Sequence, residues 1–298
     1  MFNANSIVIQ SFSQHVLERF QNLFSQATAS QLASLEQAVT TALETLLHCD
    51  CPYHDVPHTI LVTDVGLSIL QGRQIMRGDL TSDDALQAIV AMLFHDIGYI
   101  RQLLPEDNSE QSLVDQGPAF FVSPPAGASD AYMAPYHVKR GTLYIADRFA
   151  DDAAIDPVRV AECIEMTRFP VPAADAYQTT DSLPALVRAA DLIGQMADPE
   201  YQQKLTRLFA EFMETGEAER LGVRTVGELR DGFPEFFYNQ VQPYIGPGIE
   251  CLKRTQEGRT WIANLVHHLN TTRVTPQADP HHRAPELVID NTQSVHRR

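Results

Sequence analysis

Residues 81–98, TSDDALQAIVAMLFHDIG, decide the fold of this 298-residue chain. Apolar side chains recur there at helical spacing, Thr81 can cap the helix, and the aspartates behind it suit its positive end. Gly98 ends the pattern. His95 and Asp96 therefore fall in the last turn of a strongly apolar helix, where an unpaired buried carboxylate is costly. Both side chains need a partner.

Two further segments bring polar groups to inward helical faces. From His58 onward, apolar residues share one helical face, which ends at Gly72. A helix over residues 183–197 places Asp191 near its apolar side. No convincing alternating strand pattern appears, so the sequence predicts an all-α fold.

The chain divides into four predicted parts. Residues 1–50 form an N-terminal helical segment packing on the core, which spans residues 51–198. Residues 199–272 form a C-terminal helical extension, and the polar residues 273–298 a weakly ordered tail. Within the core, residues 103–135 carry many prolines and glycines, and a connection this long is either a lid or a tolerated surface insertion.

Composition limits the partners and the compartment. The formal net charge of −16 disfavours an extended nucleic-acid groove, but a small anionic substrate fits if a metal reverses the field locally. No apolar run reaches the length of a membrane span, and the N-terminus lacks a signal-peptide pattern. Four cysteines without regular spacing argue against a secreted disulfide framework, and Cys49 and Cys51 lack the second pair of a zinc knot. We therefore expect a cytoplasmic protein with reduced thiols.

The inward polar groups come from three separate helices: His58, His95 with Asp96, and Asp191. One alone would indicate a hydrogen-bonded core residue. Together they indicate a shared divalent metal ion, because a cation compensates buried carboxylates and neutral imidazoles are natural ligands. One or two ions are compatible with the pattern, and Mn, Mg, Fe, Zn and Ni are not distinguished.

Three motifs in this order resemble those of the HD-domain metal-dependent phosphohydrolases. Residues 53–59, YHDVPHT, are similar to the first motif, in the form found in cyclic-nucleotide phosphodiesterases. Residues 93–98, LFHDIG, resemble the His-Asp motif, and residues 189–193, AADLI, the final metal-ligand aspartate. The resemblance covers residues 51–198 and implies a helical bundle. It also implies metal ligation by His58, His95, Asp96 and Asp191.

The resemblance suggests roles for other residues, each with an alternative. His54 matches the proton donor to the leaving oxygen but could simply bond backbone at the helix entry, and Asp96 would lie closest to the metal-bound water. His137 is a candidate ligand for a second metal, or else a helix-start or substrate-contacting histidine. Lys139 and Arg140 could meet a phosphate or form a solvated helix face.

Some positions depart from the family patterns. Tyr99 stands where many HD hydrolases have lysine, so that phosphate contact is missing or supplied elsewhere. Arg101 and Arg168 are weaker candidates for it. Residues 164–170, IEMTRFP, replace the double histidine, glutamate and Gly-Tyr-Pro turn of the cyclic-di-nucleotide branch, which disfavours that branch.

The resulting functional prediction is hydrolysis of a small phosphoester, preferably a nucleotide phosphodiester, by metal-activated water. The first alternative is a nucleotide phosphomonoesterase with the same ligands and a different pocket. A di-iron HD oxygenase and a catalytically silent HD regulatory module rank lower. The apolar C-terminal helices would close the core or form a homodimer surface.

Overall fold

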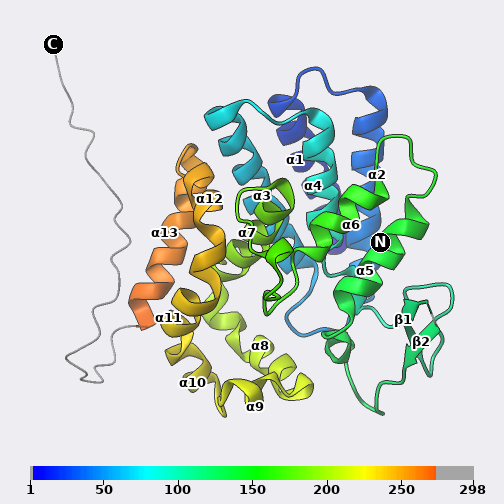
Figure 1. The fold of residues 1–298 in the computed structure, drawn as a ribbon, viewed down its shortest axis with the longest axis vertical. Coiled ribbons are helices and arrows are strands. Elements are labelled where there is room, and N and C mark those ends of the chain that lie inside the picture. Colours follow the sequence, from blue (N-terminus) through cyan, green and yellow to red (C-terminus); the bar gives the residue numbers. More distant parts are fainter. Residues whose placement is uncertain (1–2, 118, 273–298) are drawn as a thin grey trace.

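A computed structural model describes residues 3–117 and 119–272, and the predicted tail lies outside these ranges. The described chain is predominantly α-helical with one two-stranded sheet, which confirms the all-α prediction (Figure 1). The N-terminal half contains α1 (Ala4–Leu23), α2 (Ala29–Leu46), α3 (Val56–Arg77), α4 (Ser82–Phe94), η1 (Ile97–Tyr99), β1 (Ser112–Gln116), β2 (Ala119–Val122), η2 (Asp130–Met133) and α5 (His137–Arg148). The remainder contains α6 (Pro157–Glu165), η3 (Asp175–Tyr177), α7 (Leu183–Met196), α8 (Tyr201–Thr215), α9 (Glu217–Leu221), α10 (Val226–Asp231), α11 (Phe233–Phe236), the π-helix η4 (Phe237–Val241), α12 (Gln242–Leu252) and α13 (Gln256–Thr271).

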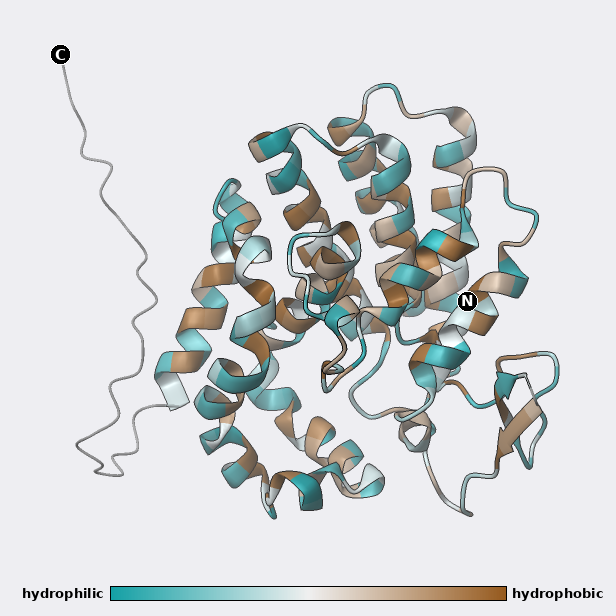
Figure 2. Cartoon of the chain, in the orientation of Figure 1, coloured by the Kyte–Doolittle hydropathy of each residue, from teal (hydrophilic) through white to brown (hydrophobic). Residues whose placement is uncertain are grey.

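Helix α4 is the central element of the bundle. Thr81 and Asp84 form a capping box at its start, as the polar residues there predict. Every residue from Ala85 to Phe94 is buried, because α2, α3, α6 and α7 all pack against the helix. Figure 2 shows apolar segments gathered where these helices meet. A helix that is apolar on all sides can be stable only at such a position.

Helix α3 is longer than predicted. It continues through Gly72 and ends at Arg77, so the predicted end at Gly72 is wrong. A Cβ atom at Gly72 would lie 2.0 Å from the carbonyl oxygen of Cys251. This glycine therefore permits close packing of α3 against α12 rather than ending a helix.

The region 103–135 contains the two strands, which the sequence did not predict. Strands β1 and β2 pair antiparallel, with Ser112 opposite Val122, and the register shifts between Leu113 and Asp115. This irregularity and the short strands explain why no alternating pattern is visible in the sequence.

The terminal segments complete the same core. Buried apolar side chains from Ile9 in α1 to Leu269 in α13 form one continuous cluster. Helices α12 and α13 pack on α3 and α7, while α1 packs on α2 and α3 (Figure 1). No helix among the described residues is both long and apolar enough to cross a membrane.

Candidate metal centre

The four predicted ligands converge on one point in the bundle. The Nε2 atom of His95 lies 3.0 Å from Oδ2 of Asp96 and 3.5 Å from Oδ1 of Asp191. The Nε2 atom of His58 lies 3.3 Å and 3.6 Å from the same two oxygens. Helices α3, α4 and α7, which supply or precede these residues, pack against one another. This packing brings together side chains that are far apart in the sequence, since 133 positions separate His58 from Asp191.

The turn after α4 orients His95 and Asp96 toward the same site. The helix ends at Phe94, so the two residues lie just beyond it rather than in its last turn as predicted. The short helix η1 follows, and its Gly98 touches α5: a Cβ there would lie 1.9 Å from the carbonyl oxygen of His137. Only glycine allows α5 to approach the ligands this closely.

Hydrogen bonds fix the histidine rings so that Nε2 faces the site. The Nδ1 atom of His95 lies 2.9 Å from the carbonyl oxygen of Met92, and Nδ1 of His137 lies 2.6 Å from that of Ala134. An Nδ1–H that donates to a carbonyl leaves the Nε2 lone pair free for a metal. The Nε2 atom of His137 lies 3.8 Å from Oδ1 of Asp96. His137 therefore lies beside the cluster, and its role as a ligand for a second metal stays a prediction.

Burial sharpens the electrostatics of this cluster. Desolvation opposes charge on each of these side chains, but at His95 and Asp96 the neighbouring charges outweigh it. Asp96 and Asp191 raise the pKa of His95, and His95 in turn lowers the pKa of Asp96. Burial lowers the pKa of His137 to about 4, which makes it neutral. Nε2 of His95 and Oδ2 of Asp96 are buried and face each other at 3.0 Å, but neither makes a well-aligned hydrogen bond within the described chain. Unpaired buried polar atoms of this kind indicate a ligand.

His54 lies at the mouth of the site and is held by a residue that the sequence did not reveal. Its Nδ1 atom lies 2.5 Å from Oε2 of Glu211, a buried residue of α8. The other oxygen of Glu211 accepts the backbone N–H groups of Tyr53 and His54, at 2.6 and 3.1 Å. Burial would lower the pKa of His54, but the charges of Glu211 and Asp96 raise it to about 9. A glutamate on the buried face of α8, near Leu208, was the only signal available in the sequence.

Tyr99 joins His54 and His137 in a stack of rings. Its ring centroid lies 4.7 Å from that of His54 and 4.3 Å from that of His137, with interplanar angles of 16° and 15°. Tyr99 therefore packs against two of the histidines at the site.

The predicted cationic contacts lie elsewhere. Arg140 is fully buried, and its guanidinium donates to Asp107 and to the carbonyl oxygens of Gly98, Ile100, Arg101 and Leu113. Every N–H group is used, so Arg140 is a structural residue rather than the expected phosphate contact. Lys139 is 42% exposed and pairs with Asp115 at 3.7 Å. Arg101 pairs with Asp50 and Asp130, and Arg168 with Glu165.

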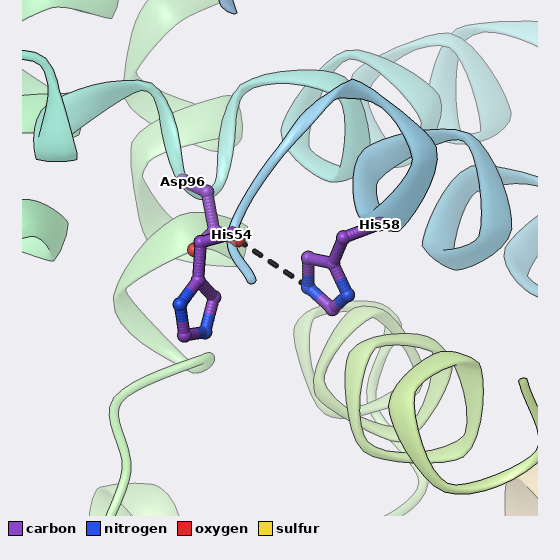
Figure 3. A group of neighbouring side chains, drawn as sticks. All are labelled: His54, His58 and Asp96. Carbon is purple, nitrogen blue, oxygen red and sulfur yellow. Dashed lines mark ion pairs between the residues drawn. The ribbon is translucent and has the colours of Figure 1, made fainter. Parts of the chain in front are cut away.

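The donor set fits a metal ion. Two overlapping groups bring their ligand atoms within 4.8 Å of one another: His54, His58 and Asp96, and His58, His95 and Asp191. Figure 3 shows the first group, with the ion pair between His58 and Asp96. Imidazole nitrogens with carboxylate oxygens suit Zn, Fe, Ni and Mn. The structure therefore has residues that could hold a metal, and two overlapping groups are compatible with more than one ion.

The comparisons with known proteins concern almost the entire chain but name no activity. A family model described as Npun_R2479-like matches residues 2–274. A search of curated proteins finds no match.

Proposed function

Because residues 2–274 match its model, the chain belongs to the Npun_R2479-like family, and we propose that it is a metal-dependent phosphohydrolase acting on a small phosphoester. One observation carries the proposal. The ligand atoms of His58, His95, Asp96 and Asp191 converge in the bundle, and Nε2 of His95 and Oδ2 of Asp96 lie buried there without a well-aligned hydrogen bond. Their order along the chain and the motifs around them, which resemble those of HD phosphohydrolases, support this chemistry over a purely structural metal.

A bound divalent cation would polarise a phosphoryl oxygen and lower the pKa of a bound water from about 15.7 to roughly 7. The chain's own residues do the rest. His58, His95 and Asp191 would hold the ion, and Asp96 is the carboxylate that both histidines share. Enclosure by α3, α4 and α7 limits access of bulk water.

His54 supplies the proton that a departing alkoxide needs. A histidine whose pKa is near 9 is protonated at neutral pH, and Glu211 holds its Nδ1–H so that Nε2–H can point away from the carboxylate. The site would therefore have an acid close to the metal ligands.

The test combines metal content with hydrolysis. Parent protein loaded with Mn²⁺ is expected to cleave bis-p-nitrophenyl phosphate, and His95→Ala and Asp96→Ala to lose both metal and activity. Asp115→Asn, an exposed change on β1, is the matched control and should behave as the parent. A panel of cyclic nucleotides and nucleoside monophosphates then separates diesterase from monoesterase. Retention of full metal content and activity in both alanine variants would refute the proposal.

A further inference from the structure

A cleft of about 270 Å³ lies between α7, α8, α10, α11 and η4. Its walls are largely apolar and include Leu208, Phe212 and Phe236, of which both phenylalanines remain half-buried. Three amide side chains also line it: Gln195, Asn239 and Gln240. Apolar walls with a few polar groups are the usual composition of a small-molecule site.

Two of the helices that line the cleft, α7 and α8, also carry Asp191 and Glu211 at the metal centre. Gln195 follows Asp191 by four residues on α7, and Leu208 precedes Glu211 by three on α8. Residues at these spacings share a helical face, with Cβ atoms about 5–6 Å apart. One wall of the cleft thus continues from a predicted metal ligand, and the facing wall continues from the residue that holds His54.

The metal centre is partly open to solvent at His54, Asp191 and His137. The side chains of Asp191 and His54 are 18% and 17% exposed, whereas those of His58 and His95 are 4% and 2% exposed. Asp191 lies four residues before Gln195 on α7, and His54 contacts Glu211 of α8. A substrate that reaches the metal centre past Asp191 and His54 therefore meets the two helices that line the cleft.

The side chains that line the cleft favour an uncharged, flat group as the ligand. Of the described side chains that line the cleft, Glu235 alone carries a charge, so a phosphate has no counter-ion there. Amides offer both donors and acceptors, which match the edge of a nitrogen heterocycle. The π-helix η4 carries Asn239 and Gln240, and such helices are frequent at functional sites.

We propose that this cleft binds the heteroaromatic group of the substrate, a nucleobase, while its phosphoester lies at the metal centre. The inference rests on the proposed function and narrows the substrate to a nucleotide. A volume of about 270 Å³ suits one ring system rather than an entire nucleotide.

The experiment measures nucleoside binding by calorimetry to the full-length protein in EDTA, because nucleosides lack phosphate and need no metal. Adenosine, guanosine, cytidine and uridine are the probes, with ribose and inorganic phosphate as negative controls. At least one nucleoside is expected to bind the parent, and Leu208→Trp, which fills the cleft, to weaken binding about tenfold or more. Met213→Leu, an exposed position on α8, is the matched control.

The rim variant Asn239→Leu/Gln240→Leu decides the result if Leu208→Trp does not fold, since both positions are exposed. The subsite is overturned if no nucleoside binds the parent. It is also overturned if the folded cleft variant, or the rim variant where Leu208→Trp does not fold, binds nucleosides as well as the parent does. Metal uptake and hydrolysis are measured separately on the same proteins. Intact metal uptake and hydrolysis without nucleoside binding therefore reject only the subsite, whereas nucleoside binding without metal uptake rejects only the proposed function.

Discussion

Two buried charged clusters meet at the turn of η1, and they differ in how their polar atoms are satisfied. In the first, Arg140 and Asp107 are 0% and 1% exposed, and the guanidinium also donates to backbone carbonyls on both sides of the turn. In the second, His95 and Asp96 are 2% and 5% exposed, and Nε2 and Oδ2 face each other without a well-aligned hydrogen bond. We call the first the closed cluster, because a complete network of hydrogen bonds of this kind maintains a fold. We call the second the open cluster, because buried polar atoms without well-aligned hydrogen bonds indicate a site for a ligand.

The largest effect is expected at Arg140, whose cluster is complete. Arg140→Met leaves the carboxylate of Asp107 buried without its cation and should lower the free energy of unfolding by about 3–5 kcal/mol, measured in urea. Lys139→Met is the matched control, since that side chain is 42% exposed, and should change it by no more than about 0.5 kcal/mol. A loss under about 1 kcal/mol at Arg140 would mean that the network is dispensable.

Unlike the closed cluster, the open cluster should stabilise the protein only when a metal ion is bound. With Mn²⁺ at about 100 times its Kd, the parent should gain about 2.7 kcal/mol in unfolding free energy, and EDTA should remove the gain. Asp96→Asn should gain little, because the shared carboxylate is neutralised, whereas Asp115→Asn should gain as the parent does. Equal stabilisation of Asp96→Asn and parent would place the ion elsewhere.

The two clusters also differ in what the sequence reveals. His95, Asp96 and Asp191 were predicted because each interrupts an apolar helical face with a polar group. Glu211 was not, because it reaches His54 across 157 residues and no local pattern links the two. Arg140 follows exposed Lys139 near the start of α5, and only tertiary packing distinguishes a buried guanidinium from a solvated one.

The same logic applies to the fold. Helical periodicity predicted the all-α class, but not that Gly72 lies inside α3, because the approach of Cys251 depends on α12. The hairpin of β1 and β2 was missed because its short strands carry a register shift. Long-range contacts, rather than local propensity, determine both features.

The contact between His54 and Glu211 should appear in the pH dependence. As a proton donor, His54 is active when protonated, so the rate should fall as pH rises through its pKa of about 9. Glu211→Gln removes a negative charge that raises this pKa, so the alkaline limb should move to lower pH. A shift of about one unit corresponds to about 1.4 kcal/mol.

A choice of leaving group controls for structural damage in Glu211→Gln. An alkyl phosphodiester needs the proton, whereas p-nitrophenolate leaves without it. The variant should therefore lose more activity on the alkyl ester. Equal losses on both esters, with an unmoved alkaline limb, would assign Glu211 to the fold alone.

The smallest effect is expected at Tyr99, which connects the two clusters. Its neighbour Gly98 accepts from Arg140, while its ring stacks on His54 and His137. Tyr99→Leu replaces both ring contacts by an aliphatic side chain, which should cost about 1 kcal/mol in total, and the imidazole NMR signals of both histidines should shift. Tyr99→Phe keeps the stack and should resemble the parent. If the Phe variant shifts the histidine signals as much as the Leu variant does, the hydroxyl rather than the ring is what Tyr99 contributes. The closed cluster then does not position the open one through this residue.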